Sequence, residues 1–570
     1  MAETVQISTL RRTLRRTFGF RSLREGQEEV IRSIVEGRDT LVIMPTGAGK
    51  SLCYQLPGAQ LPGTTVVVSP LLSLMKDQVD KLQELGIEAT QVNSTLTSRE
   101  ESDVLEGIEK EQHEFVFVTP ERLAQPGFLE TLKTNEIDVF VIDEAHCISQ
   151  WGHDFRPSYL RLREAVEALG NPPVLALTAT ATPEVVDDIL RQLGREDMQV
   201  ISTGVFRENL RLEVIRAAGD GAKLGHLARL LSEIEGTGIV YTSTVKDCEA
   251  VTDYLESLGF AVARYHGRLG GKERHRNQDR FMAGELKAVV ATNAFGMGID
   301  KPDIRFVIHY NMPGTLEAYY QEAGRAGRDG EPARCVMLFQ PEDKNTHIFF
   351  LNGKYPKREH FVAVYRAMER LKAGREPQPP VTAPEIHQRA KEVVLNKVRV
   401  VLPAMKDLGL VDEPEAGSFR LTRSGLDAEE LEKLSAKYEQ RSEADRDRLR
   451  RILLYAQTAL CRWKSILDYF GESQAVDWNN RGDRCGVCDN CGHPIAEPVV
   501  SHDRLAVRPP HAQPEVLPLP PILGEKNPST LRQGDTLTLS IFGTGEVREV
   551  GVESLTVAFS DGEVREFRHR

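Results

Sequence analysis

The chain has 570 residues and a formal net charge of −12, with 40% hydrophobic and 27% charged residues. This length exceeds what one hydrophobic core supports, so we expect three to five domains. The acidic balance argues against a protein that coats nucleic acid through bulk electrostatics, and it leaves local basic surfaces for phosphate contact. The sequence has no run of eighteen apolar residues and no charged start followed by an apolar segment. We therefore expect no membrane span, no secretory signal and a cytoplasmic protein.

Short apolar runs alternate with helical stretches between residues 37 and 340. Most of the runs end in Ser, Thr, Asp or Pro, as buried parallel strands do when their carboxyl ends carry polar groups. Ligands bind beyond such ends. The runs are 40–45, 65–70, 115–120, 139–144, 174–180, 238–244, 288–293 and 306–311. We predict an α/β fold with two parallel-sheet domains, residues 1–205 and 206–340.

The segment MPTGAGKS (44–51) follows the first run and precedes an expected helix. Glycines at 47 and 49 let a backbone curl around phosphate, while Lys50 would reach the β- and γ-phosphates and Ser51 would hold Mg²⁺. Met44 stands where the eight-residue pattern has glycine, and a simple glycine turn is the alternative. The residues expected to contact the nucleotide are Thr46, Gly47, Ala48, Gly49, Lys50 and Ser51.

The segment VFVIDEAH (139–146) supplies the expected partner of this loop. Its apolar residues would bring Asp143 to the end of a strand, where the carboxylate can hold Mg²⁺ and Glu144 can polarise the attacking water. Adjacent acids after a strand are otherwise often a solvated turn.

The segment QEAGRAGRDG (321–330) carries two arginines three residues apart. On one helical turn, both guanidiniums of Arg325 and Arg328 could point from the second domain at a γ-phosphate held by the first. Hydrolysis would then depend on closure of the cleft. A basic helix end that makes surface salt bridges is the alternative.

Together these motifs resemble the RecQ family of superfamily 2 helicases, over about residues 10–340 and 440–493. The resemblance implies two RecA-like domains, ATP-dependent and Mg²⁺-dependent unwinding of DNA in the 3′→5′ direction, and a role in DNA repair or recombination. The segment 18–27 resembles the family's adenine-reading segment, which assigns Phe20, Arg24 and Gln27 to the base. The segment 293–313 resembles a motif that senses DNA and ribose, with Asp300 as the ribose contact.

The stretch CISQWGHDFRPSY (147–159) resembles the aromatic-rich loop by which RecQ proteins bind single-stranded DNA. Aromatic rings offer stacking faces to bases, and an arginine adds a cation. Aromatics that cap the domain core are the alternative. The residues expected to couple DNA binding to the catalytic acids are His146, Gln150, Trp151, Phe155 and Arg156.

Composition changes after residue 340. Residues 341–377 read as connecting helices, with an amphipathic helix at 360–371, and residues 378–425 read as a winged helix with its wing at 413–418. Lys391, Lys397 and Arg399 are available for phosphates. A packing-only role for this small module is the alternative.

Four cysteines, Cys461, Cys485, Cys488 and Cys491, have the spacing of one Zn²⁺ site. We predict a helical, structural Cys₄ module at 426–493, with Cys461 on a helix; His493 could replace one ligand. The remaining cysteines, Cys53, Cys147, Cys248 and Cys335, read as single buried residues.

The predicted winged helix precedes the zinc module, whereas RecQ proteins place it after. Arginines that lead into the zinc site could therefore contact the duplex instead, although a solvated basic face explains them equally well. These are Arg446, Arg448, Arg450 and Arg451.

Residues 494–530 are rich in proline and predict an extended linker. Residues 531–570 alternate apolar and polar positions between Gly-rich turns, which predicts a small β-barrel. They resemble the SH3-like or Tudor-like barrel of UvrD-type helicases, which implies a protein partner.

The favoured function is an ATP-dependent DNA helicase, associated with the nucleoid, that binds single-stranded and duplex DNA. One alternative is an ATP-driven translocase that acts on RNA or remodels nucleoprotein. Another is a zinc and winged-helix regulator with a vestigial motor, against which the intact motor motifs argue.

Overall fold

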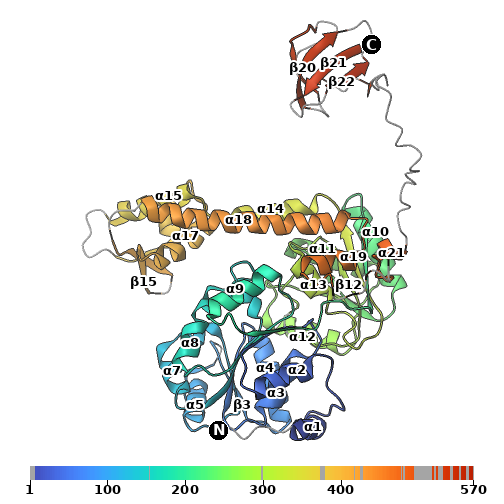
Figure 1. Cartoon of the computed structure of the whole chain (residues 1–570). Helices are drawn as coiled ribbons and strands as arrows, with labels where there is room; N and C mark the ends of the chain where they lie inside the picture. Colours follow the sequence, from blue (N-terminus) through green and yellow to red (C-terminus); the bar gives the residue numbers. More distant parts are fainter. Residues whose placement is uncertain are drawn as a thin grey trace. The chain divides into compact units, whose positions relative to one another are not determined.

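The computed structural model describes residues 7–492 except 95, 153, 297–298, 373–378, 416, 424–427, 475, 477 and 479–481. Beyond these it describes residues 517–518, 522–523, 531–539, 543–550, 554–559 and 564–568. The chain forms two compact units, Met1–Ile495 and Ala496–Arg570. Figure 1 traces the first unit from the blue first lobe through a green second lobe to orange helices.

The first lobe is built on a parallel sheet whose described strands run in the order β3-β4-β2-β5-β6-β1-β7. The strands are β1 (Thr40–Ile43), β2 (Thr64–Val68), β3 (Ala89–Val92), β4 (Phe115–Val118), β5 (Ile137–Ile142), β6 (Val174–Thr178) and β7 (Gln199–Ser202). The helices are α1 (Ile7–Arg16), α2 (Gln27–Val35), α3 (Lys50–Gly58), α4 (Leu72–Glu84), α5 (Ser98–Glu109), α6 (Pro120–Leu123), α7 (Pro126–Leu132), η1 (Ala145–Ile148), η2 (Pro157–Arg161), α8 (Leu162–Ala168) and α9 (Pro183–Leu193).

Both faces of this sheet are buried, which explains why its central strands are almost wholly apolar. Leu41 and Ile43 of β1 lie in one core and Val42 lies in the other, because successive strand residues point to opposite faces. One core receives α5, α7, α8 and α9, and the other receives α2, α3 and α4 (Figure 1). The polar carboxyl ends of the strands are left for the site.

The second lobe repeats the plan with a parallel sheet whose described strands run in the order β10-β11-β9-β12-β13-β8. The strands are β8 (Leu210–Arg216), β9 (Thr237–Tyr241), β10 (Val262–Tyr265), β11 (Ala288–Ala291), β12 (Ile304–His309) and β13 (Ala333–Phe339). The helices are α10 (Asp220–Glu233), α11 (Val245–Ser257), α12 (Gly271–Met282) and α13 (Leu316–Ala323). The prediction of two parallel-sheet domains is confirmed.

After the second lobe, a small module packs around its own hydrophobic core. It contains α15 (Arg358–Lys372), α16 (Ala383–Arg389), α17 (Leu395–Asp407) and a sheet of β14 (Val381–Thr382), β16 (Ser418–Leu421) and β15 (Val411–Glu415). The expected amphipathic helix, helix pair and strand pair are all present. We call residues 358–421 the winged-helix-like module; the winged-helix assignment and the binding role both stay predictions. Part of the expected wing, residue 416, lies outside the described residues.

The long helix α18 (Ala428–Gln457) joins this module to the zinc region, next to α14 (Asp343–Lys354). The ring of Tyr438 in α18 packs against that of Phe361 in α15, with centroids 5.7 Å apart and ring planes tilted by 47°, and Ile452 and Tyr455 enter a core of the second lobe. Helices α19 (Arg462–Tyr469) and α21 (Asp489–Gly492) follow. The expectation that Cys461 lies on a helix was wrong, because Cys461 immediately precedes α19. The predicted boundary at 425–426 and His493 lie outside the described residues.

The second unit contains a sheet whose described strands run in the order β17-β22-β21-β20-β19-β18. They are β17 (Leu517–Pro518), β18 (Ile522–Leu523), β19 (Thr536–Leu539), β20 (Gly543–Val550), β21 (Ser554–Phe559) and β22 (Val564–Arg568). Two of these strands come from 494–530, so the prediction that this whole segment is an extended linker was wrong. Apolar residues such as Ile522 and Leu523 explain the pairing with β19. Among the described pairings the sheet does not close into the predicted barrel.

Within the described residues, every helix is too short or too polar to span a membrane.

Candidate functional site

The phosphate loop, residues 44–51, connects β1 to α3. Gly47 and Gly49 have left-handed backbone, with φ of 84° and 89°. Residues other than glycine rarely adopt this conformation. A Cβ on Gly47 would lie 2.8 Å from Cγ of Arg328, and one on Gly49 would lie 2.5 Å from Nε2 of Gln27. The loop therefore admits only bare backbone at both positions.

Lys50 begins α3 and lines the cavity above the loop, together with Ser51. Its Nζ donates to the Met44 carbonyl at 3.2 Å. Burial lowers the pKa of Lys50, and the charges of Glu144 and Asp143 oppose this shift. The ammonium group thus shares one polar pocket with the two acids that follow β5.

Asp143 is the first residue after β5, and its N–H donates to the Val68 carbonyl at 2.9 Å. Its carboxylate accepts from Glu144 N at 3.0 Å and lies 3.4 Å from Ser69 Oγ. Burial, followed by the charge of Glu144, raises the pKa of Asp143 to about 7. A divalent cation reverses such a shift because it stabilises the ionised carboxylate. Asp143 and Ser51 together offer hard oxygen donors suited to Mg²⁺.

Glu144 has left-handed backbone, with φ of 51°, a conformation that costs on the order of 1–3 kcal/mol in a residue other than glycine. One of its carboxylate oxygens lies 3.3 Å from Nδ1 of buried His146. The same Nδ1 lies 3.0 Å from Oγ1 of Thr178 at the end of β6. His146 therefore connects the second acid to the neighbouring strand.

The segment expected to read adenine lies beside the phosphate loop. Gln27 is 2% exposed; its Oε1 accepts from Arg24 N at 2.8 Å and its Nε2 donates to the Gly49 carbonyl at 2.9 Å. The Arg24 guanidinium donates to the Gly47 carbonyl. In this arrangement both side chains brace the loop, and Phe20 is 52% exposed. Their contact with the base stays a prediction.

Arg325 and Arg328 lie in a turn after α13 ends at Ala323, so the expected helical turn was wrong. The guanidinium of Arg325 donates to the Gly296 carbonyl. Arg328 donates to Oδ1 of Asp300 at 2.9 Å, and the Arg328 side chain is only 11% exposed. We call residues 324–330 the arginine turn. Glycines interrupt the helix here, so backbone geometry instead of helical spacing orients the two side chains.

Two residues that the sequence analysis did not identify, Arg207 and Asn209, donate hydrogen bonds to backbone carbonyls of the arginine turn. The Arg207 guanidinium donates to the carbonyls of residues 324, 326 and 327 at 2.7, 2.9 and 2.5 Å. Asn209 Nδ2 donates to the Gly327 carbonyl at 2.8 Å. Burial lowers the pKa of Arg207. No motif or periodicity marks these residues, because they act on carbonyls that only the fold brings near.

A cavity of about 650 Å³ collects these groups from both lobes. Gln321 of α13 bridges the lobes, since its Nε2 donates to Thr180 Oγ1 at 3.2 Å. The predicted residues that line the cavity are Phe20, Arg24, Gln27, Thr46, Gly47, Gly49, Lys50, Ser51, Asp143, Glu144, His146, Arg156, Asp300, Arg325 and Arg328. The structure thus brings separately identified sequence segments from both lobes to one polar pocket, which is suited to a triphosphate.

The aromatic loop, residues 149–156, follows η1. Its start is fixed by buried Asp188, whose Oδ2 accepts from Ser149 Oγ at 2.7 Å and from Gln150 N at 3.1 Å. Trp151 is 40% exposed, and Phe155 is half-buried. Trp151 therefore does not cap the domain core. Downstream of the loop, the Tyr159 hydroxyl donates to the Asp143 carbonyl at 3.1 Å.

The four predicted cysteines come together, with sulfurs all within 4.8 Å of one another. Sγ of Cys485 and Sγ of Cys491 are 3.8 Å apart, close to the ~3.8 Å edge of a tetrahedron with zinc–sulfur bonds of about 2.3 Å. Backbone N–H groups of Cys485 and Cys488 point at sulfurs at 3.3 Å, which stabilises thiolates. The residues therefore fit Zn²⁺, and four sulfurs leave no open position for catalysis.

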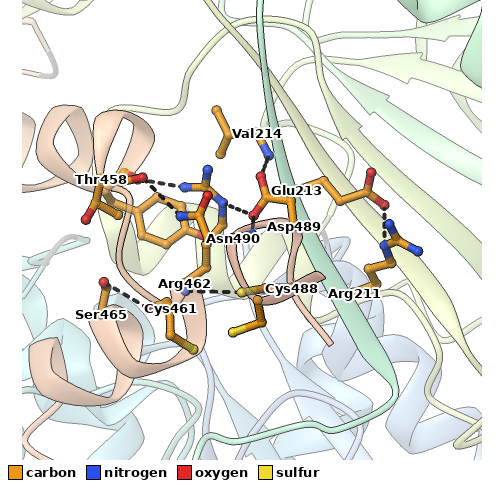
Figure 2. Close-up of polar contacts among 12 residues, drawn as sticks. Arg211, Glu213, Val214, Thr458, Cys461, Arg462, Ser465, Cys488, Asp489 and Asn490 are labelled. Carbon is orange, nitrogen blue, oxygen red and sulfur yellow. Dashed lines mark hydrogen bonds and ion pairs between the residues drawn. The ribbon is translucent and has the colours of Figure 1, made fainter. Parts of the chain in front are cut away.

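The cysteine site also holds the edge of the second lobe (Figure 2). Asp489 Oδ2 accepts from the N–H of Val214 in edge strand β8 at 2.8 Å, and Asp489 Oδ1 accepts from Arg462 Nε at 2.5 Å. Asn490 Nδ2 donates to the Thr458 carbonyl at 3.0 Å. A metal that orders the cysteine loop therefore also fixes the strand that follows Arg207.

Three segments of the chain match models of known protein families. Residues 24–189 match the DEAD/DEAH box helicase model, residues 222–330 match the helicase conserved C-terminal domain, and residues 425–492 match the RecQ zinc-binding model. The probable ATP-dependent DNA helicase RecS of Bacillus subtilis is 38% identical over 492 residues, which cover 86% of this chain and 93% of RecS.

The ATP-dependent DNA helicase RecQ of Bacillus subtilis is 47% identical over 328 residues, which cover 57% of this chain and 55% of RecQ. The chain thus spans about half of that relative. Among solved structures, the DUF1998 helicase MrfA bound to DNA aligns with a TM-score of 0.50 at 17% identity, covering 76% of this chain and 61% of MrfA. This last likeness concerns the fold alone.

Proposed function

This chain belongs to the RecQ family of ATP-dependent DNA helicases, and we propose that it unwinds duplex DNA in the 3′→5′ direction, in DNA repair or recombination. The similarity to RecS along 93% of that protein supports DNA as the substrate. The observation that carries the proposal is the position of Arg328, whose Cγ lies within 2.8 Å of where a Cβ on Gly47 would be. An arginine of one lobe therefore lies directly against the phosphate loop of the other.

In the proposed mechanism, Lys50 and the bare loop hold the triphosphate, and Ser51 and Asp143 would hold a Mg²⁺ ion, which would supply positive charge to neutralise the phosphates. Glu144 polarises the attacking water. Arg325 and Arg328 are now bonded to the Gly296 carbonyl and to Asp300. Exchange of these bonds for phosphate oxygens would join the lobes when the nucleotide binds.

Hydrolysis would be coupled to DNA through the aromatic loop. His146 contacts Glu144, and Tyr159 contacts the Asp143 carbonyl, so the segments that precede and follow the loop are joined to the two acids. Trp151, which is 40% exposed, offers a base-stacking face worth about 1–3 kcal/mol. Stacking that moves the loop would therefore shift the acids relative to the triphosphate.

Other regions would hold the duplex and the partners. We propose that the winged-helix-like module contacts phosphates through Lys391, Lys397 and Arg399, while Zn²⁺ keeps a structural role. We further propose that the second unit binds a protein partner, since it has its own buried core, and that the protein acts at the cytoplasmic nucleoid, where its substrate lies.

The test is unwinding of a duplex with a 3′ tail beside the same duplex with a 5′ tail. The wild-type protein should open the 3′-tailed substrate in the presence of ATP and Mg²⁺, and Lys50→Ala should open neither. Preference for the 5′ tail would contradict the polarity. ATP turnover without opening, or opening of the equivalent RNA duplex alone, would favour a translocase that acts on RNA or nucleoprotein.

The Trp151→Ala variant tests the coupling. It should keep the basal ATPase rate and lose most stimulation by single-stranded DNA, because the exposed ring would act only when a base stacks on it. Full stimulation in Trp151→Ala would place DNA sensing elsewhere. ATP turnover that survives Lys50→Ala would show that the motor site is not the one described.

A further inference from the structure

The aromatic loop contacts α18, a helix that lies some 290 positions away in the sequence. Arg441 Nη2 donates to Gln150 Oε1 at 3.0 Å, and the Arg441 guanidinium lies over the Phe155 ring at 4.8 Å from its centroid. Arg448 Nη2 donates to the Trp151 carbonyl. Three of the loop's four predicted DNA-coupling residues, Gln150, Trp151 and Phe155, are thus each contacted by one of two arginines.

The two arginines lie on one face of α18, because seven residues complete nearly two turns. Each is held by further contacts. Arg448 is 11% exposed and lies 2.7 Å from Oδ1 of Asp445; Oδ2 of the same carboxylate accepts from Lys354 Nζ at 3.0 Å. Burial favours the neutral form of Asp445, but Lys354 and other donors outweigh it and lower its pKa. Arg441 also lies 6.0 Å from the Tyr438 ring.

Helix α18 is itself braced on both sides of these arginines. Tyr438 packs on Phe361 in the winged-helix-like module, and Leu449 and Ile452 lie in the core that the second lobe shares with the zinc region. Figure 1 shows α18 running unbroken from α15 and α17 to α19. A rigid support of this kind is what a residue needs in order to fix the orientation of another side chain.

We propose that Arg441 and Arg448 are positioning residues that hold the aromatic loop ready for single-stranded DNA. The flat guanidinium of Arg441 fixes the plane of the Phe155 ring, and its hydrogen bond fixes Gln150. Arg448 fixes the backbone at Trp151. This inference rests on the proposed role of the loop in DNA sensing. It adds that the loop is oriented by the helix joining the winged-helix-like module to the zinc region.

The sequence analysis considered four arginines of α18 as contacts for duplex DNA. The structure gives three of them other contacts. The Arg448 side chain is only 11% exposed, and its guanidinium already binds Asp445 and the loop. It is therefore not available for phosphate. Arg450 and Arg451 are exposed and pair with Asp447 at 3.1 and 2.8 Å. Arg446 is exposed, and its role on the solvated face stays a prediction.

The test measures ATPase rate against single-stranded DNA concentration in Arg441→Ala. Without the contacts of Arg441, the loop is not held in its binding orientation, so part of the DNA-binding energy must be spent on ordering it. The DNA concentration for half-maximal stimulation should therefore rise about tenfold, the effect of one cation–π contact and one hydrogen bond. Basal rate and rate at saturating DNA should stay near wild type. An unchanged or lower half-maximal concentration would overturn the proposal, the latter by showing that Arg441 blocks the ring.

Three controls separate this result from other causes. Arg229→Ala removes an exposed arginine that pairs only with Glu233 among the contacts described here, at 3.7 Å, and should match wild type. Arg441→Lys keeps the charge without the flat fork and should fall between wild type and Arg441→Ala. Zinc content and melting temperature report folding.

A double-mutant cycle tests whether Arg441 acts through the ring. If it does, Arg441→Ala should have a smaller effect in the Phe155→Leu background than in wild type, since Phe155→Leu already removes the ring contact and only the hydrogen bond to Gln150 is left to lose. Full additivity would contradict the proposal. If wild type itself shows no DNA-stimulated ATPase, then the proposed function fails, and that result is visible before any variant is compared.

Discussion

We call the contact between the Arg207 guanidinium and the backbone of the arginine turn the clamp. Arg207 lies outside the helicase motifs, so its role can be tested separately from theirs. Replacement of Arg207 by alanine removes a charged donor from three backbone carbonyls, at 324, 326 and 327. Hydrogen bonds from charged groups are worth about 1.5–3 kcal/mol each, and water can replace the outermost. A loss of about 3 kcal/mol in the ordering of the turn therefore follows, which corresponds to roughly a 100-fold fall in kcat.

The assay is steady-state ATP hydrolysis at saturating single-stranded DNA, with kcat and KM for ATP measured separately. Arg207→Ala should lower kcat and change KM for ATP little, because Lys50 and the phosphate loop are untouched. Arg211→Ala is the matched control, since Arg211 is exposed and pairs with Glu213 at 3.1 Å on the same strand. Wild-type kcat in Arg207→Ala, with normal melting temperature, would refute the clamp.

Three further outcomes are expected. Zinc chelation should lower the melting temperature and speed hydrogen exchange at the amide of Val214. The reason is that this amide donates to Asp489, which the cysteine loop holds in place. Unchanged exchange would show that the metal does not stabilise β8. Gly47→Ala should abolish ATP binding, measured by calorimetry, since its φ of 84° and its closeness to Arg328 exclude a Cβ; retained affinity would contradict this. Gln321→Ala should reduce DNA-stimulated ATPase about tenfold while ATP affinity holds, since one interlobe hydrogen bond is lost; equal stimulation would exclude that bond from coupling.

Most central strands were predictable from the sequence because burial on both faces makes them continuously apolar; β13, between β12 and β8, is a central strand that was not among the predicted runs. The strands not predicted include β3, β7, β8 and β10, which are the four edges of the two sheets. Edge strands keep polar residues, as QVIS in β7 shows, where Gln199 is half-buried and Val200 is 44% exposed. Apolar runs alone cannot reveal them.

The site was predictable where a motif carries its own chemistry, as with Lys50 and the acids after β5. It was not predictable where a side chain serves a distant backbone. Arg207 binds carbonyls about 120 positions away, and Arg441 binds a loop about 290 positions away. Helical spacing also misled, since Arg325 lies beyond the end of α13, where glycines release the backbone from the helix.

The central claim is that cations from the second lobe complete a triphosphate site on the first. Single-turnover hydrolysis by Arg325→Ala, paired with direct measurement of its ATP affinity, tests this most directly. The account predicts that ATP affinity stays within about threefold of wild type, while the hydrolysis rate falls by on the order of 10³, as for an arginine finger. A near wild-type rate, or a loss confined to ATP affinity, would contradict it.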